Sequence, residues 1–412
     1  MNVLIAAVGT RGDVQPAVAL ALGLSAHGHR VRFAVPPNFQ AWVESLGLEV
    51  IPIGFDVEDF IGHIGYRALK GTRRLRGQTQ VQFDALDEVA SEVDLLVGTS
   101  VFAAGPTLAE RHRIPYRHVG FGPSLLPSRE HPGLLVKWQR LPRWLNRLSW
   151  RLNSLGWNLA FRGPLSRMRA RAGLGPVEDL WRHLWGEEAW IAADPALAPL
   201  PADAEIPAVQ TGCWWLPEPE PISAETAAFL ARGPAPVFLG FGSMGDPNPS
   251  RTTATVLEAV RRAGVRAIVS RGWAKLDAAA PSSNVHFAGP EPHGKLFARC
   301  AAIVHHGGAG TTSQAARAGV PQLLVPHLLD QFFWADRVWR AGLSPKPIPR
   351  TRLNADRLAR GLRSCLDDTL AERARALAPR MTTDGVERAV RLVEALAPGR
   401  SEAANRERRG VG

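Results

Sequence analysis

Residues 304–313 read Val304-His305-His306-Gly307-Gly308-Ala309-Gly310-Thr311-Thr312-Ser313. The apolar run before this stretch predicts a short buried strand, and the alanine-rich residues after it predict a helix. A glycine-rich turn between a strand and a helix N-terminus presents free backbone N–H groups and the positive end of the helix dipole. Because threonine hydroxyls and a histidine ring can donate further hydrogen bonds, the turn suits a phosphate. An ordinary strand-to-helix turn is the alternative, since lone glycine loops are weak signals.

A second buried strand is predicted from Gly319 onward, and the polar pair Asp330-Gln331 follows it. In open α/β sheets, ligands bind at the carboxyl ends of the strands. A carboxylate beside an amide suits several sugar hydroxyls, because the carboxylate accepts hydrogen bonds and the amide both donates and accepts. Asp330 also fits the N-cap of a helix that begins near Gln331. Both roles can hold at once.

These two stretches resemble the donor-binding signature of nucleotide-sugar glycosyltransferases with the GT-B fold. The chain is most similar to the bacterial branch that includes antibiotic glycosyltransferases and sterol 3-β-glucosyltransferases, and the similarity covers residues 1–60 and 205–395. The resemblance implies an α/β protein of the GT-B class, with two Rossmann-like domains facing across a cleft. It also implies a UDP- or dTDP-linked sugar as cosubstrate and no other cofactor. No metal is implied, and the sequence has no Asp-x-Asp metal motif.

The length of 412 residues predicts more than one domain. We expect an N-terminal, acceptor-binding Rossmann-like domain at 1–212 and a proline-rich linker at 213–233. A nucleotide-sugar-binding Rossmann-like domain is expected at 234–384. By resemblance, a helix at 385–399 returns to the N-terminal domain, and residues 400–412 are expected to be a disordered tail.

The chain opens with a predicted strand, turn, helix and second strand, without the Gly-x-Gly-x-x-Gly fingerprint, so a nicotinamide cofactor is not expected. Asp13 lies on the first turn, where it fits a helix N-cap. The resemblance implies instead that Asp13 is the general base, taking a proton from an acceptor hydroxyl that attacks the anomeric carbon with inversion. Thr10, Arg11 and Gly12 share this turn and are candidates for binding the donor. Arg11 either faces the donor diphosphate across the cleft or is solvated.

The resemblance places the remaining donor contacts in the C-terminal half. Asp330 and Gln331 would bind the sugar hydroxyls, while the diphosphate would be held by His306, Gly308, Gly310, Thr311 and Ser243. Arg271 and Trp273 end a predicted strand, where their planes could stack on uracil or thymine. A core position is the alternative for Trp273. Plant relatives carry a tryptophan near the position of Gly289, and this chain does not.

Residues 131–190 are rich in tryptophan and arginine and show helical spacing in part. Three interpretations compete: amphipathic helices that pack on the N-terminal domain with outward-pointing arginines, a pocket for a large apolar acceptor, and a face that contacts a membrane peripherally. Residues 54–76 show no clear periodicity and are expected to be loops that hold the acceptor.

The formal net charge is +11, which fits an anionic nucleotide sugar or an anionic membrane surface. We expect no nucleic-acid partner, because no zinc-finger, RNA-recognition or basic-zipper pattern is present. The three widely spaced cysteines fit the cytoplasm, with peripheral membrane contact through 131–190 as a further expectation. No apolar run approaches the roughly 20 residues that cross a bilayer.

The predicted function is therefore an inverting, metal-independent hexosyltransferase that acts on a hydroxyl of a large hydrophobic acceptor. A polyketide or macrolide, a sterol or other terpenoid, and a glycopeptide aglycone all remain compatible. Two alternatives belong to other classes. One is a non-hydrolysing nucleotide-sugar epimerase, which would act on the donor without an acceptor, and the other is a catalytically silent nucleotide-sugar-binding protein.

Overall fold

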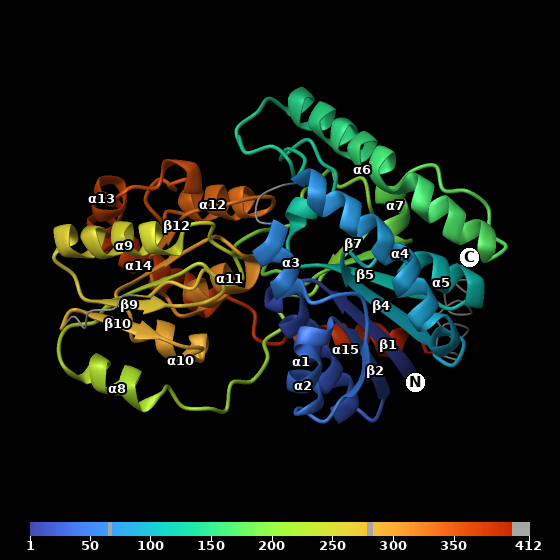
Figure 1. Ribbon diagram of the computed structural model, residues 1–412, viewed down its shortest axis with the longest axis horizontal. Coiled ribbons are helices and arrows are strands. Elements are labelled where there is room, and N and C mark those ends of the chain that lie inside the picture. The colour runs from blue at the N-terminus through green and yellow to red at the C-terminus, as the bar shows by residue number, and fades with distance from the viewer. Residues whose placement is uncertain (65–67, 278–282, 398–412) are drawn as a thin grey trace, which may run out of the picture.

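The computed structural model describes residues 1–64, 68–277 and 283–397; within that range, the side chains of 61–64 and 68–75 are not described. Two parallel sheets form two α/β domains that lie side by side (Figure 1). The N-terminal sheet has the order β3-β2-β1-β4-β5-β6-β7, and the C-terminal sheet has the order β10-β9-β8-β11-β12. The predicted α/β class with two parallel-sheet domains is confirmed. The predicted tail at 400–412 lies outside the described residues.

The strands of the N-terminal sheet are β1 (Asn2–Val8), β2 (Arg30–Val35), β3 (Glu49–Pro52), β4 (Leu95–Ser100), β5 (Tyr116–Gly120), β6 (Ala189–Ile191) and β7 (Ala208–Gln210). Those of the C-terminal sheet are β8 (Val237–Gly240), β9 (Ala267–Ser270), β10 (Val285–Ala288), β11 (Ala302–His305) and β12 (Gln322–Leu324).

The helices before the second sheet are α1 (Arg11–Ala26), α2 (Gln40–Glu44), α3 (Val57–Ile64), α4 (Ala68–Ala90), α5 (Gly105–His112), α6 (Arg143–Arg171), α7 (Leu180–Trp185) and α8 (Ala224–Ala231). Those after β8 are α9 (Pro249–Ala263), α10 (His293–Phe297), α11 (Ala309–Arg317), α12 (Gln331–Arg340), α13 (Ala355–Cys365), α14 (Asp368–Leu377) and α15 (Gly385–Ala395).

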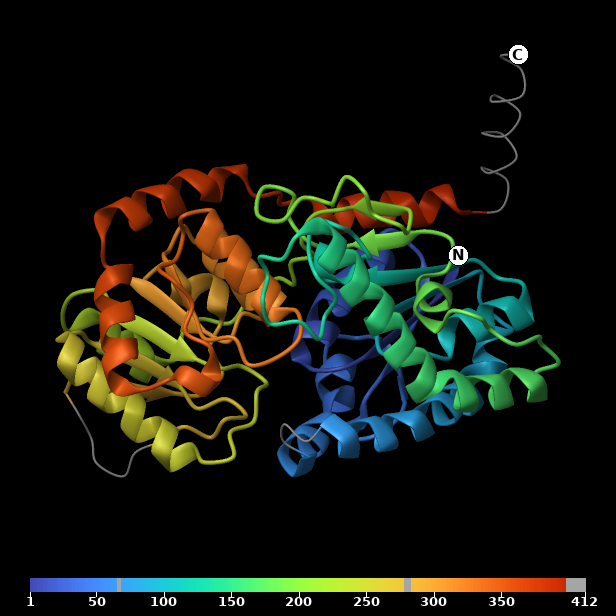
Figure 2. The same cartoon turned by 90° about the horizontal axis from the view of Figure 1, so that it is seen from above.

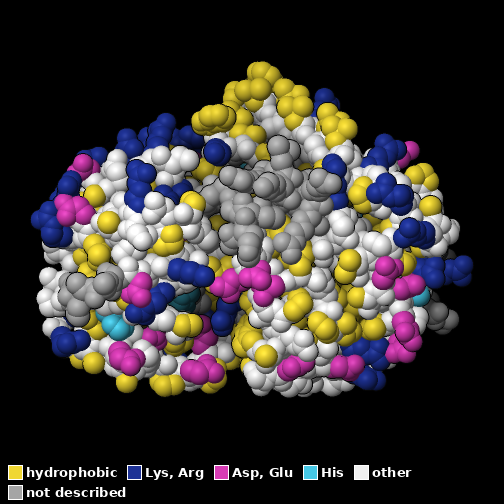
Figure 3. Space-filling model, in the orientation of Figure 1, with side chains coloured by type: hydrophobic (Ala, Val, Ile, Leu, Met, Phe, Trp, Pro, Cys, Tyr) yellow, Lys and Arg dark blue, Asp and Glu magenta, His cyan; other side chains and the backbone are white. Residues whose placement is uncertain are grey.

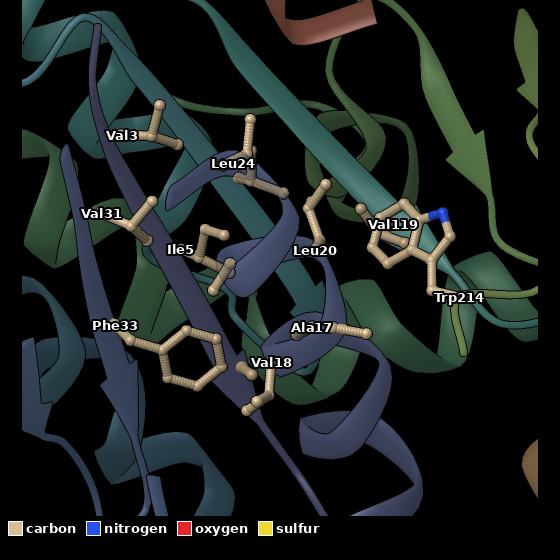
Figure 4. Close-up of a cluster of buried hydrophobic side chains, with 14 of the residues drawn as sticks. Val3, Ile5, Ala17, Val18, Leu20, Leu24, Val31, Phe33, Val119 and Trp214 are labelled. Carbon is tan, nitrogen blue, oxygen red and sulfur yellow. The ribbon is translucent and has the colours of Figure 1, made fainter. Parts of the chain in front are cut away.

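The first strand and helix form the core of the N-terminal domain. Strand β1 is buried on both faces, as expected for a parallel strand covered by helices on each side. Figure 4 shows Ile5 of β1, Leu20 of α1 and Phe33 of β2 converging in this core. Each of these side chains is fully buried, which is worth about 1.5–3 kcal/mol apiece relative to exposure.

The strand order reverses beside β1, because β2 lies on one side of it and β4 on the other. Val8 pairs with Ser100 at the carboxyl ends of β1 and β4. A crevice forms at such a switch point, because the connections leave the sheet toward opposite faces. The end of β1 and the first turn of α1, which carries Asp13, border this crevice.

The last helix, α15, leaves the C-terminal domain and packs on α1, as the red helix in Figure 2 shows. Val390 and Val393 are buried in the same cluster as Leu20 and Leu24. The chain therefore passes between the domains twice, once after β7 and once before α15.

The two passages between the domains touch each other. Asp194 Oδ2 accepts hydrogen bonds from the backbone N–H and the hydroxyl of Thr382, both at 2.6 Å. The Trp215 indole N–H donates to the carbonyl of Thr382 at 3.2 Å. A Cβ on Gly385 would lie 2.9 Å from the carbonyl carbon of Gly212, so the backbones meet where only glycine fits. We call this contact the crossover clasp.

Two sequence-based expectations are wrong. Residues 224–231 of the predicted linker form α8, because Ser223 caps the helix and its Phe229 and Leu230 are buried among C-terminal core residues. The free linker is thus shorter than 213–233. Residues 54–76, expected as loops, contain α3 and the first part of α4.

Candidate active site

Asp13 is the third residue of α1, and it faces the turn that precedes the helix. The backbone N–H of Thr10 donates to Asp13 Oδ2 at 2.7 Å, and the Thr10 hydroxyl donates to the same oxygen at 3.1 Å. Thr10 is therefore the N-cap, and Asp13 completes a capping box, which corrects the idea that Asp13 itself is the N-cap. The hydrogen bonds fix the position of the carboxylate at the crevice.

The environment of Asp13 makes its carboxylate more basic. Burial raises its pKa above the ordinary value near 3.8, and the hydrogen bonds from Ser100 and Thr10 oppose that rise. A carboxylate that is held in place and partly desolvated is suited to accept a proton from a hydroxyl group.

Two residues that hold Asp13 were missed in the sequence. The Ser100 hydroxyl donates to Asp13 Oδ1, and Ser100 has a φ of 53°, which is unusual for a residue other than glycine. Gly9 leaves the space that the carboxylate fills, since a Cβ there would lie 2.6 Å from Asp13 Cγ. Ser100 could have been found only by knowing that β4 lies beside β1.

An apolar cavity of about 270 Å³ opens beside Asp13. Its polar lining includes Asp13, Ser100, His118 and Asp330, and the last of these comes from the C-terminal domain. Most of its other walls are apolar, and several come from the segment 131–190: Leu134, Leu135, Trp157, Leu180, Trp181, Leu184 and Trp185. That segment thus packs on the N-terminal domain, as the first of its three interpretations predicts, and it also lines an apolar pocket.

Two glutamine oxygens in the cavity wall are unpaired. Gln78 Oε1 and Gln82 Oε1 are buried without a hydrogen-bond partner among the described residues. His118 lies in the same wall, with Nδ1 2.8 Å from the Tyr116 hydroxyl, and burial lowers its pKa to about 3. Apart from the carboxyl groups of Asp13 and Asp330, the cavity therefore offers an apolar lining with a few uncharged polar groups, typical of a small-molecule site.

Asp330 lies across the crevice from Asp13, at the start of α12. Burial, and secondly the charge of Asp13, raise its pKa from the ordinary value of 3.8 to about 7. Its neighbour Gln331 is buried, and Gln331 Oε1 accepts from the backbone N–H groups of His327 at 2.8 Å and Leu328 at 3.2 Å. The Gln331 side chain thus holds the loop that presents Asp330.

His306 is packed between two glycine turns. A Cβ on Gly242 would lie 2.8 Å from His306 Cε1, and a Cβ on Gly308 would lie 2.5 Å from His306 Nε2. Its Nδ1 is buried and has no partner among the described residues. Burial, with smaller effects from His305, His327 and His293, lowers the pKa of His306 well below its usual range. The imidazole is therefore neutral, and its buried Nδ1 makes no hydrogen bond within the described part of the chain.

The glycine-rich turn ends where α11 begins. Gly307 has a φ of 92°, which glycine adopts without strain, and Gly308 is the N-cap of α11. The Thr312 hydroxyl donates to the carbonyl of Gly308 at 2.8 Å, so it holds the helix end. Gly310 is exposed and Thr311 is half-buried, and both lie in the first turn of α11.

Three further predicted donor-site residues follow strands β8 and β9 of the C-terminal sheet: Ser243, Arg271 and Trp273. Ser243 is half-buried and directly follows Gly242, which packs on His306. The Arg271 guanidinium is held against the neighbouring strand β10, because its Nη1 donates to the carbonyl of Phe287 at 2.6 Å. The Trp273 ring stacks on Phe39 of the N-terminal domain, with ring centroids 6.5 Å apart. Trp273 therefore contributes to the contact between the domains.

Arg11 stands on the N-terminal side of the crevice. Its Nε donates to Gln15 Oε1 at 3.0 Å, and its guanidinium lies 4.7 Å from the centroid of the Trp42 ring. Arg11 is exposed to solvent at the crevice, but the protein around it partly desolvates the guanidinium, which lowers its pKa, and the nearby charges of Glu218 and Glu220 oppose that lowering. Gly12, also exposed, follows it in the first turn of α1. Within the described part of the chain, no cluster of three or more His, Cys, Asp or Glu side chains could hold a metal ion.

Comparison with solved structures gives the class of the fold. A glycosyltransferase of kitacinnamycin matches 96% of this chain and 99% of its own, with a TM-score of 0.74 at 20% identity. The structure of the glycosyltransferase VinC in complex with dTDP matches 96% and 99%, with a TM-score of 0.66 at 21% identity. The fold is that of the GT-B glycosyltransferases, as predicted.

Sequence comparison gives the family. Residues 3–117 match the model of the glycosyltransferase family 28 N-terminal domain, and residues 256–393 match the erythromycin biosynthesis protein CIII-like C-terminal domain. The vancomycin aglycone glucosyltransferase of Amycolatopsis orientalis is 37% identical over 95% of this chain and 97% of its own. A sterol 3-beta-glucosyltransferase of Arabidopsis thaliana is 32% identical over 95% and 67%. The chain therefore belongs to this family of glycosyltransferases and is an enzyme of that kind.

Proposed function

We propose that the protein transfers a hexose or deoxyhexose from a UDP- or dTDP-linked sugar to a hydroxyl of a large hydrophobic acceptor, with inversion. The observation that carries this proposal is the placement of Asp13. One hydrogen-bonded, partly desolvated carboxylate lies at the switch point of the N-terminal sheet and faces an apolar cavity, with Asp330 of the C-terminal domain on the far wall.

The chemistry follows from these positions. An acceptor bound in the apolar cavity would place its hydroxyl against Asp13, which takes the proton. The oxygen attacks the anomeric carbon from the face opposite the diphosphate, so the new glycosidic bond forms as the bond to the phosphate oxygen breaks. The nucleoside diphosphate then leaves with both electrons of that bond.

The C-terminal domain would hold the donor. The diphosphate would be bound by the His306 imidazole, by the first turn of α11 with Gly308, Gly310 and Thr311, and by Ser243. Hydrogen-bond donors and a helix dipole can stabilise the leaving diphosphate, so we propose that no metal is required. Asp330 would bind sugar hydroxyls, with Gln331 holding its loop.

The names of related proteins support the proposed classes of donor nucleotide and acceptor. The dTDP-epi-vancosaminyltransferase of Amycolatopsis orientalis is 33% identical to this chain, and its name specifies a dTDP sugar. The names of the other relatives specify an antibiotic aglycone and sterols. An antibiotic aglycone or a sterol fits the apolar lining of the cavity, and its own hydroxyl or amide N–H groups could meet the unpaired oxygens of Gln78 and Gln82.

The test separates the base from the donor site. Calorimetric titration with UDP, dTDP and GDP should show binding of UDP or dTDP to the wild type and to Asp13→Asn, and weaker binding to His306→Ala. Transfer should be abolished in Asp13→Asn and unchanged by EDTA. Turnover retained by Asp13→Asn would refute the base assignment. Conversion of the donor sugar without any acceptor would indicate an epimerase instead.

A further inference from the structure

Exposed apolar side chains are concentrated on one helix and the segment before it. Of the ten large apolar side chains that are exposed among the described residues, seven lie within 135–159. They are Leu135, Trp138, Trp144, Leu148, Leu152, Leu155 and Leu159. Figure 3 shows hydrophobic atoms gathered at the top of the molecule, where α6 begins in Figure 1. We call these seven residues the α6 ridge.

The ridge has no partner in the described structure. Helix α6 buries its inner face, with Trp150, Leu165 and Met168, against the N-terminal domain. At about 100° per residue, the ridge residues from Trp144 to Leu159 fall within an arc of about 80° on the opposite side. A helix that only covered the domain would carry polar residues there. The second apolar face is therefore not explained by folding.

The charges beside the ridge are of one sign. Residues 131–177 contain nine lysines and arginines and no aspartate or glutamate. Arg140, Arg143 and Arg169 pair with carboxylates of other segments. Five arginines of α6 are exposed and have no carboxylate partner among the residues whose side chains are described: Arg147, Arg151, Arg162, Arg167 and Arg171.

This pattern selects a lipid surface over a protein. Tryptophan and leucine on one helix face, with arginines along its flank, make up the composition of helices that lie in a membrane interface. The arginine stems can lie along apolar surface while their charges reach lipid phosphates. None of the described helices is both long and apolar enough to span a bilayer, so the contact would be peripheral.

We propose that the α6 ridge docks on an anionic lipid surface. Leu135 belongs to the ridge and also lines the cavity beside Asp13, together with its neighbour Leu134. Docking would therefore set the cavity entrance against the lipid, so that an apolar acceptor could enter without crossing water. Only this last consequence rests on the proposed function.

The proposal is tested by co-sedimentation of the full chain with vesicles of phosphatidylcholine mixed with phosphatidylglycerol, and with vesicles of phosphatidylcholine alone. The wild type should bind the anionic vesicles and lose binding at high salt. The double substitution Trp144→Glu/Leu152→Glu should weaken binding at least about tenfold. The matched control Leu366→Glu changes an exposed leucine of the C-terminal domain and should bind as the wild type does.

Every outcome decides the matter. Because the substituted side chains are exposed, the variants should keep the wild-type circular dichroism and nucleotide binding. Arg147→Gln/Arg151→Gln provides a milder second variant, in which binding to anionic vesicles should fall. Absence of vesicle binding by the wild type, or equal binding by the ridge variant, would overturn the proposal. A dimer that the ridge substitutions dissociate in sedimentation velocity, without vesicle binding, would instead show that a second copy covers the ridge. Vesicle binding needs no sugar donor, so these results are independent of the transferase assays.

Discussion

The free energy of unfolding of Asp330→Asn, relative to that of the wild type, should increase as the pH rises. The folded protein keeps the proton on Asp330 up to a pKa of about 7, because burial and the charge of Asp13 disfavour the ionised form. The unfolded chain loses that proton near pH 4. Between these values the folded state binds more protons than the unfolded state, so the free energy of unfolding falls with increasing pH. Asparagine removes that cost.

The size of the effect follows from the shift. A rise from 3.8 to about 7 corresponds to about 4 kcal/mol at most, since one pKa unit is worth about 1.4 kcal/mol. Roughly two units of that shift lie above pH 5. The stability of Asp330→Asn relative to the wild type should therefore increase by up to about 2.5 kcal/mol between pH 5 and pH 8.

Urea unfolding followed by tryptophan fluorescence at several pH values measures this difference. The control is Asp84→Asn, which removes an exposed carboxylate on α4 outside the cavity. In Asp13→Asn the charge that raises the pKa of Asp330 is removed, so the fall in the free energy of unfolding with pH should be smaller than in the wild type. In Asp13→Asn/Asp330→Asn no proton is bound at position 330, so this contribution to the pH dependence should be absent. A difference between Asp330→Asn and wild type that stays constant from pH 5 to pH 8 would refute the view that Asp330 is desolvated next to Asp13.

Three further predictions concern positions that the structure singles out. Gly9→Ala should lower kcat at least about tenfold, because the added Cβ displaces the Asp13 carboxylate. The control Gly12→Ala, whose Cβ would lie 3.5 Å from the Thr10 hydroxyl, should fold normally and keep Asp13 in place. Equal kcat values for Gly9→Ala and the wild type would show that the position of the carboxylate is not critical. His306→Ala should weaken dTDP or UDP binding by about 1.5–3 kcal/mol in calorimetry, the value of one hydrogen bond to a charged group, because a neutral imidazole has one N–H to donate. Val390→Ala should lower the free energy of unfolding by about 1–3 kcal/mol through a cavity against α1, whereas the exposed Arg391→Ala should change it by less than about 0.5 kcal/mol; a null effect at Val390 would mean that α15 contributes nothing to the N-terminal core.

The parts of the site with local sequence signals could be predicted. Strand, turn and helix periodicity located the turns of Asp13 and His306, since glycines and cap residues mark both. The parallel sheets followed from alternating apolar strands and helices. Asp330 was located as the residue after a buried strand, which is where ligands collect in such sheets.

The parts that depend on sheet order could not be predicted. Ser100 reaches Asp13 only because β4 pairs with β1 across a long sequence separation. The Trp273 ring stacks on Phe39 of the other domain, a contact that periodicity does not reveal. Helix α8 was hidden among prolines, and α3 and α4 were hidden by weak periodicity.

The crossover clasp has a consequence for how the two domains can move. The two passages of the chain touch at Gly212 and Gly385, and Asp194 of the N-terminal domain binds Thr382 of the second passage, so the passages act as one attachment point. A rotation of one domain relative to the other would therefore have its hinge at this contact, and the displacement of each residue would increase with its distance from the hinge. Asp13 and Asp330 line the same cavity from different domains, so a small rotation at the hinge would change the distance between them and the space that the acceptor can occupy.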